Sequence, residues 1–305
     1  MTLYALNPWH TFTHPHVRNL AWVIASPSLL SYLPNTDYAV DVLGDDFWQQ
    51  HYLAYLPKLQ LLDNYPQALE QFLSQHPHHR LGYYFEYLLL FWLLDNEYHP
   101  FELIKHRATL YEGKITRGEL DFLVKNQQTG QVEHWEAAVK FYLGYQPLNN
   151  AYDWWGANDN DRLGNKLRHL ANKQFSHVAY QNSVIERRCL IIKGRLFYPL
   201  SHKALQSRAQ RTELDCLAAQ HLQGSYMLWQ DFVKHPQTGL WQWRYAGKDE
   251  WFANQQPHKQ LSLTLPQYLP LLNSERAELV IAFDAQQQEQ ARCFVRAAKR
   301  QVALN

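Results

Sequence analysis

Two carboxylates and a lysine in residues 118–145 have a spacing that could bring them together. Two apolar-rich runs flank the polar connector 126–130, which ends in a glycine, and this pattern is typical of a hairpin. Side chains alternate between the two faces of a strand, so Asp121 takes one face of the first run, and Glu136 and Lys140 share a face of the second. Two acids and a lysine on neighbouring strands could support divalent-metal and phosphodiester chemistry.

A helix is the alternative structure for the second run. Glu136 and Lys140 are also four residues apart with the acid first, the favourable order for an ion pair on a helix, and Ala137 and Ala138 are good helix formers. The β-branched and aromatic residues around them favour a strand, and Gly144 stops the run early. We therefore expect a strand. A helix here would remove the basis for the catalytic interpretation.

The strongest helix pattern of the chain, residues 82–96, comes before this hairpin. It is apolar almost all round, which predicts a buried helix, and it contains one acid early in its length, Glu86. Burying an unpaired carboxylate costs on the order of several kcal/mol. Glu86 therefore either points to a wet edge of the helix or contributes to the site.

A second helix is expected over residues 161–173, after a loop rich in Asn, Asp and Trp. Arg162, Lys166 and His169 fall on one face of it and form a cationic stripe. Such a stripe is either a solvated face or a surface for the phosphates of a substrate.

The remaining patterns predict three consecutive parts. These are an N-terminal helical region over 1–79, an α/β core over 80–200 and an antiparallel β-rich elaboration over 201–305. In the first part, a helix beginning at residue 45 should end at Pro57. In the last part we expect a helix over 205–222, a hairpin over 225–252 and two closing strands, 278–284 and 292–298.

Composition limits the classes of function. The 305 residues carry a formal net charge of +1, so any contact with nucleic acid must come from a local patch. Three cysteines without a CxxC pair argue against a disulfide scaffold and fit a reducing cytoplasm. We expect a cytoplasmic protein without a membrane span, because the sequence shows neither a signal-peptide pattern nor about 18 consecutive apolar residues. Nucleophile-elbow, P-loop and dinucleotide fingerprints do not occur either. The oligomeric state is left open.

The order of the motifs resembles the PD-(D/E)XK nuclease-like superfamily, which has the restriction-endonuclease fold. More narrowly, the chain looks like one of the bacterial families of unknown function within it. The resemblance covers about residues 80–195. Its residues are Gly82 and Glu86 in GYYFE, Gly118 to Asp121 in GELD, Glu136 and Lys140 in WEAAVKFYL, and Asp161, Leu163 and Lys166 in the following helix.

This resemblance implies a mixed central sheet flanked by helices, and a nuclease that acts on nucleic acid. It implies that Asp121 and Glu136 bind Mg²⁺ (or Mn²⁺), and that Lys140 orients the attacking water or stabilises the developing charge. Glu86 would assist from its helix. The metal would lower the pKa of a bound water and neutralise charge on the scissile phosphate.

The sequence departs from the superfamily pattern at one position. The second acid normally stands two residues before the lysine, where this chain has Ala138. Glu136 lies one strand step further away, about 6.6 Å, whereas Mg²⁺ ligands bind at about 2.1 Å. Three outcomes are open: a bulge re-aims Glu136, another acid such as Glu86 or Glu119 completes the site, or the fold is inactive. An inactive fold would act as a nucleic-acid- or protein-binding module.

Overall fold

The chain divides into two compact units that each combine segments distant in sequence. The computed structural model describes residues 7–76, 80–112, 114–181, 183–200, 214–253 and 276–297. The first unit comprises residues 1–140, 166–194 and 215–221, and the second comprises 141–165, 195–214 and 222–305. The three consecutive parts expected from the sequence, 1–79, 80–200 and 201–305, do not coincide with these units. Residues 205–213 of the helix expected over 205–222 lie outside the described residues, and the helix is wrong for the described half, 214–222, which forms turns and the first residue of a strand.

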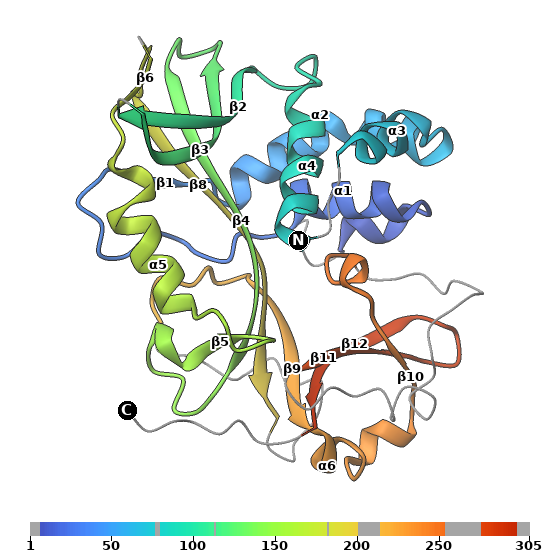
Figure 1. Cartoon of the computed structure of the whole chain (residues 1–305). Helices are drawn as coiled ribbons and strands as arrows, with labels where there is room; N and C mark the ends of the chain where they lie inside the picture. Colours follow the sequence, from blue (N-terminus) through green and yellow to red (C-terminus); the bar gives the residue numbers. More distant parts are fainter. Residues whose placement is uncertain are drawn as a thin grey trace. The chain divides into compact units, whose positions relative to one another are not determined.

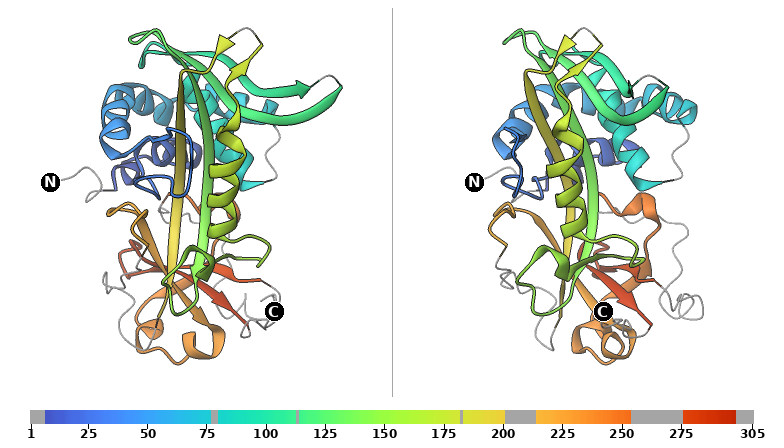
Figure 2. Two further views of the ribbon diagram at one scale, coloured as in Figure 1. Left: turned by 90° about the vertical axis from the view of Figure 1, so that its left-hand side faces the viewer. Right: turned by 60° about the vertical axis from the view of Figure 1, so that its left-hand side comes forward.

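The first unit is a mixed α/β structure whose sheet is flanked by helices. Helices α1 to α4 lie on one side of the sheet, and α5 lies on the other (Figures 1 and 2). The expectation of a sheet between helices is confirmed at this level, and the N-terminal region is helical as expected. The bounds of the helices are Pro15–Ala25 for α1, Asp45–Asn64 for α2, Gln67–Gln75 for α3, Leu81–Leu93 for α4 and Leu163–Asn172 for α5.

The sheet of the first unit is mixed. Its strand order is β1-β8-β4-β3-β2, and β2, β3 and β4 form an antiparallel meander. β1 pairs with β8 in parallel. β8 and β4 run in the same direction, since Glu186 lies beside Val132 at one end and Gly194 beside Lys140 further along. The strands are Asp41–Val42 (β1), Phe101–Glu112 (β2), Ile115–Asn126 (β3), Val132–Gly144 (β4) and Arg187–Pro199 (β8), with the small ribbon Ala179–Tyr180 (β6) and Ser183–Val184 (β7).

The hairpin of β3 and β4 places the second run of the sequence motif in a strand. Phe122 pairs with Trp135 and Leu123 with His134 in an antiparallel register. The prediction of a strand at residues 136–140 is confirmed, and the alternative of a helical ion pair there is wrong.

Both faces of β4 are covered, which decides the environment of every side chain on it. On the face toward α2 and α4, the Trp135 ring packs against Phe101 at 4.7 Å between ring centroids and Phe47 at 6.0 Å. On the opposite face, His134 lies 5.5 Å from the ring of Phe175, which follows α5. A polar side chain on either face therefore enters a largely dry environment.

Helix α2 continues past Pro57, contrary to the expected end at that residue. A proline inside a helix removes one hydrogen bond and costs about 3 kcal/mol. The buried face of α2 continues on both sides of it, with Trp48 and Tyr55 before it and Leu59 after it. Helical stability in proteins comes chiefly from burying such a face, so packing outweighs the cost of the proline.

The second unit is rich in β-structure but only partly antiparallel. Strands β10, β11 and β12 are successive antiparallel neighbours, whereas β9 pairs in parallel with both β12 and the last residues of β8. The closing strands are thus confirmed as a hairpin, and the expected hairpin over 225–252 is wrong. The bounds are Trp154–Gly156 (β5), Leu222–Leu228 (β9), Trp229–Phe232 (α6), Gln242–Tyr245 (β10), Glu278–Phe283 (β11) and Glu289–Arg296 (β12).

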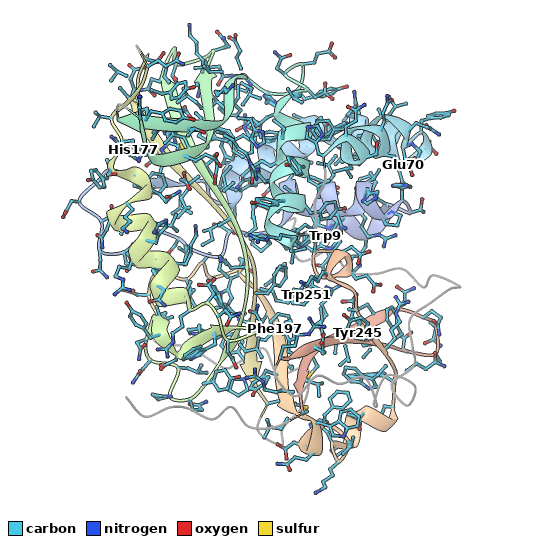
Figure 3. The ribbon with its side chains drawn as sticks, in the orientation of Figure 1. Trp9, Glu70, His177, Phe197, Tyr245 and Trp251 are labelled. Carbon is cyan, nitrogen blue, oxygen red and sulfur yellow. The ribbon has the colours of Figure 1, made fainter. Side chains whose placement is uncertain are left out.

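Aromatic packing explains why β9 and β10 do not pair with each other. Phe232 in α6 is buried with Trp243 of β10 at 4.7 Å between ring centroids, so the chain turns into a short helix after β9. Phe294 of β12 is held between Phe197 and Trp251, at 4.5 and 5.0 Å between ring centroids. Figure 3 labels Phe197 and Trp251. The alternation of aromatic residues in the sequence therefore reflects these contacts. No helix in the described ranges combines the length and apolar character needed to cross a bilayer.

A close approach between β8 and β4 gives a test of the sheet. Gly194 has φ +146°, and a Cβ there would lie 1.8 Å from the backbone oxygen of Lys140. We expect Gly194→Ala to lower the free energy of unfolding by at least about 3 kcal/mol, because a strained φ is combined with a clash against backbone. The measurement is chemical denaturation.

Gly82→Ala is the matched control, since Gly82 lies in α4 with no atom within 4 Å of its added Cβ. It should be neutral or stabilising by up to about 1 kcal/mol. Equal stability of the two variants would contradict the packing of β8 on β4.

Candidate active site

Asp121 on β3 and Glu136 on β4 form a pair of neighbouring acids, called the acid pair below. The paired register ends at Phe122 and Trp135, and Asp121 and Glu136 are the next residues on their strands. Asp121 Oδ2 accepts a hydrogen bond of 2.9 Å from the backbone N–H of Ala137, so its carboxyl group takes a donor of β4. Glu136 is 2 % exposed and Asp121 is half-buried. The structure therefore brings together the two acids that the sequence proposes as metal ligands.

Glu136 is held from two sides by neutral hydrogen-bond partners. His134, two residues earlier on the same face of β4, lies with Nε2 2.9 Å from Glu136 Oε1. Gln174 Nε2 donates to Glu136 Oε2 at 2.7 Å. Gln174 begins the short turn Gln174–Ser176 (η4) after α5, and its Oε1 lies 3.1 Å from His169 Nε2. These contacts fix the direction of the Glu136 carboxyl group.

The acid pair is buried at an electrostatic cost. Burial raises the pKa of Asp121 well above its ordinary value, and the charge of Glu136 raises it further. Burial also raises the pKa of Glu136, although the Gln174 hydrogen bond and the charge of Lys166 oppose that rise. Burial lowers the pKa of His134 to about 4, so this imidazole is neutral near pH 7. The protein thus favours a protonated state of the acid pair.

Lys166 of α5 is the cation that acts on both acids. Its charge lowers the pKa of Asp121 and of Glu136. Lys140, expected from the sequence to do this work, lies on the same face of β4 as Glu136 and is partly buried. The position that the superfamily pattern gives to an acid, Ala138, lies between them.

The three residues predicted to bind substrate are not all in one helix. Lys166 and His169 lie together in α5, and the charges of Lys166 and Lys173 both lower the pKa of His169, after the larger effect of its burial. Arg162 comes just before α5 begins, and its guanidinium lies 3.4 Å from the ring centroid of Trp155 in the second unit. The predicted helix began two residues earlier than α5 does, and this is why it included Arg162.

Glu86 is held in an ion pair. Arg107 donates from Nε and Nη2 to its two oxygens at 2.7 and 2.8 Å, and His106 Nε2 lies 2.6 Å from Oε1. Burial alone would raise the pKa of Glu86, but these hydrogen bonds lower it below its ordinary value. Glu86 is therefore an anion whose charge further raises the pKa of Asp121. Its expected catalytic role stays a prediction.

The acid pair has the donor chemistry that suits Mg²⁺ or Mn²⁺. Both ions prefer carboxylate oxygens, and Mg²⁺ commonly takes one or two carboxylates and keeps several waters. A divalent cation would offset the burial that raises both pKa values and the charge of Glu136 that raises the pKa of Asp121 further. Within the described part of the chain, no three His, Cys, Asp or Glu side chains gather as a ready metal site.

Residues 18–296 match the family model described as a domain of unknown function (DUF1853). The chain belongs to this family. The search of curated proteins and the search of solved structures found no match.

Three features of the site were not recognised in the sequence. His134 stands two residues before Glu136, so strand alternation alone could have placed it beside that acid. Lys166 was assigned to substrate, because its approach to the acids depends on how α5 packs on the sheet. Gln174 follows the end of α5 in an irregular turn. A residue in an irregular turn follows neither helix nor strand periodicity, so the sequence pattern did not indicate Gln174.

The raised pKa values predict that the acid pair lowers stability at alkaline pH. A folded-state pKa above the unfolded value favours the native state below the unfolded pKa, and this contribution is lost as pH rises through the folded pKa. We expect Asp121→Asn to raise the free energy of unfolding at about pH 8 by about 0.5–2 kcal/mol, and by less at about pH 5. Thermal denaturation at several pH values measures the difference.

Glu119→Gln is the control, since Glu119 is an exposed acid on the same strand. It should change stability by no more than about 0.5 kcal/mol. A destabilised Asp121→Asn protein at every pH would contradict the assignment of raised pKa values.

Proposed function

We propose that this protein hydrolyses phosphodiester bonds in nucleic acid with Mg²⁺ or Mn²⁺ held by the acid pair. The observation that carries the proposal is the closeness of Asp121 and Glu136 on adjacent strands, with the charge of Lys166 acting on both. Perturbed carboxyl groups beside a cation are typical of catalytic sites. The bound ion would lower the pKa of a water and neutralise charge on the scissile phosphate.

Each residue around the acid pair has a role in this proposal. Asp121 and Glu136 hold the cation through hard carboxylate oxygens. Lys166 contacts the phosphate whose charge increases in the transition state, where a fixed cation is most effective. Gln174 orients the Glu136 carboxyl group through its 2.7 Å hydrogen bond. Glu86 keeps Arg107 in place beside this region.

The order of the elements supports the proposal. The chain runs α4, β2, β3, β4, α5 and β8. Asp121 lies on β3, the middle strand of the meander, and Glu136 lies on β4, the middle strand of the sheet of the first unit. This order agrees with what the resemblance to the PD-(D/E)XK superfamily implies. In that resemblance the lysine belongs to the strand. Here the electrostatics favour Lys166 of the helix as the cation at the acids.

Cleavage of plasmid and single-stranded substrates with Mg²⁺ or Mn²⁺ tests the proposal. Asp121→Ala and Glu136→Gln should abolish cleavage, and Lys166→Ala should reduce the rate by about 10²-fold or more, because a preorganised charge at the transition state is lost. Lys140→Ala should cost less than Lys166→Ala.

Lys58→Ala is the matched control, since Lys58 pairs with Asp95 at 3.0 Å in the helical layer of the same unit. Its rate should equal that of the wild type. Equal cleavage by wild-type and Asp121→Ala proteins would mean that the activity is a contaminant and would refute the proposal.

The alternative function is a nuclease-like fold that binds nucleic acid or protein without hydrolysing it. Ala138 at the usual acid position and the ion pair of Glu86 favour this alternative. It predicts binding without turnover under every metal condition. Binding to nucleic acid would weaken with salt as phosphate contacts release counterions, whereas binding to a protein at apolar surfaces would not.

The affinity of the acid pair for a metal ion should fall as the pH is lowered. The two carboxyl groups must lose their protons to bind a cation, and burial raises both pKa values. Mn²⁺ affinity should therefore fall as pH is lowered from about 8 to about 6, by more than solvent-exposed carboxylates would show. Calorimetric titration of the full chain measures it, with Asp121→Asn as the variant that loses the site. Affinity independent of pH in this range would contradict metal binding at the acid pair.

A further inference from the structure

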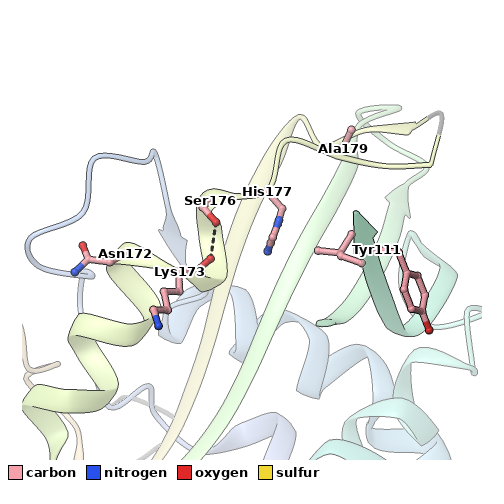
Figure 4. A pocket seen from close by; sticks show the side chains of 7 residues that line it. Tyr111, Asn172, Lys173, Ser176, His177 and Ala179 are labelled. Atoms are coloured by element: carbon pink, nitrogen blue, oxygen red, sulfur yellow. Dashed lines mark hydrogen bonds between the residues drawn. The ribbon is translucent and has the colours of Figure 1, made fainter. Parts of the chain in front are cut away.

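A hollow of about 620 Å³ opens in the first unit where the end of α5 and η4 approach β2 (Figure 4). Its lining includes Asn172, Lys173 and His177 on one side and Tyr111 of β2 on the other. In Figure 4, His177 lies between Lys173 and Tyr111. The lining is mixed, with polar groups and an exposed aromatic ring. The roles assigned above do not use these four side chains.

One short segment joins this hollow to the acid pair. Gln174 donates to Glu136, while its neighbour Lys173 and the nearby His177 line the hollow. The backbone of the segment is fixed on the sheet, because Arg188 of β8 donates from Nε to Phe175 O at 2.9 Å and from Nη2 to His177 O at 3.0 Å. The hollow and the acid pair are therefore held in a constant geometry.

The distance between the hollow and the acid pair can be estimated along α5 and along β3, and both give about the same value. Lys166 and Lys173 are seven residues apart on α5, about 10 Å along its axis. His177 packs over Gly118 of β3, where an added Cβ would lie 3.2 Å from Nε2, and Gly118 precedes Asp121 by three residues, about 10 Å along the strand. A stacked strand advances about 3.4 Å per nucleotide, so the hollow lies within about three nucleotides of a phosphate at the acid pair.

The chemistry of the hollow suits a base better than a phosphate. α5 ends at Asn172, so its C-terminal end faces this region with partial negative charge, which disfavours an anion. The Tyr111 side chain is 68 % exposed on a strand, a position where a large aromatic ring gains little from burial. Exposed rings beside a cationic track are typical of surfaces that stack unpaired bases. Here that track is Lys166 and Lys173.

We propose that this hollow binds an unpaired nucleobase close to the bond that is cut, with Tyr111 and His177 as its stacking residues. The inference rests on the proposed function and adds its substrate class: single strands, flaps or frayed ends rather than intact duplex. A base inside a duplex stays stacked on its neighbours, and taking it out costs a few kcal/mol. Lys173 would follow the backbone of the same strand.

Binding by the full-length Asp121→Asn protein tests this inference without cleavage. The probe is a fluorescein-labelled single-stranded oligonucleotide of about ten nucleotides, measured by anisotropy beside the same sequence as a blunt duplex. We expect the single strand to bind at least about fivefold more tightly than the duplex. We expect Tyr111→Ala and His177→Ala each to weaken single-strand binding at least about fivefold.

Tyr65→Ala is the matched control, because Tyr65 is 66 % exposed and follows α2, outside the hollow. It should bind the single strand as Asp121→Asn alone does. Preference for duplex, absence of single-strand binding, or unchanged affinity in both Tyr111→Ala and His177→Ala would overturn the inference.

The result separates this inference from the proposed function. Single-strand binding that depends on Tyr111, together with a wild-type protein that cleaves nothing, would support the base site and refute hydrolysis. Metal-dependent cleavage that depends on Asp121, with affinity unaffected by Tyr111→Ala and His177→Ala, would support hydrolysis and refute the base site.

Discussion

The burial of two carboxyl groups opposite each other on β3 and β4 is the constraint to which the rest of the first unit responds. Water is excluded from one face of these strands by α5 and from the other by α2 and α4. A charged carboxylate is unfavourable there, so it must either bind a proton or lie beside a positive charge such as a lysine or a metal ion. Lys166 and Gln174 provide part of that compensation. A divalent cation would complete it, which links the cost in stability to the proposed function.

Glu133 and Glu86, two other buried acids of the first unit, are compensated differently from the acid pair. Glu133 on the opposite face of β4 accepts hydrogen bonds from Asn126, Trp135 and Arg187, and Glu86 is neutralised by Arg107. Those acids have donors for their oxygens, as structural carboxylates do. The acid pair also has hydrogen-bond partners, but its two carboxyl groups lie close to each other and burial raises both of their pKa values. That difference is the reason why the proposed function assigns the chemistry to Asp121 and Glu136.

Strand and helix periodicity was enough to predict most of the first unit. The polar connector before Val132, the β-branched and aromatic residues of β4 and the apolar run of α4 act locally, so their structures follow from nearby residues. The end of α2 depends on the packing of Leu59 and Leu62 against other elements, which outweighs a local signal at Pro57. The parallel pairing of β9 joins strands that are far apart in the chain. No local pattern encodes such a pairing.

The same distinction holds for the site. Asp121 and Glu136 could be brought together from the sequence, since hairpin register is a local property. The effect of Lys166 on these acids could not be predicted, because it depends on the packing of α5 on the sheet. Gln174 and the hollow beside it depend on an irregular turn whose position is fixed by Arg188 from β8. Side chains from irregular segments become visible only with the tertiary structure.

A crystal of the protein grown with Mn²⁺ tests the central claim most directly, through the anomalous scattering of the metal. The account predicts one strong anomalous peak between the carboxyl groups of Asp121 and Glu136, lost in the Asp121→Asn protein. The absence of anomalous density between the two carboxyl groups at saturating Mn²⁺ would contradict it.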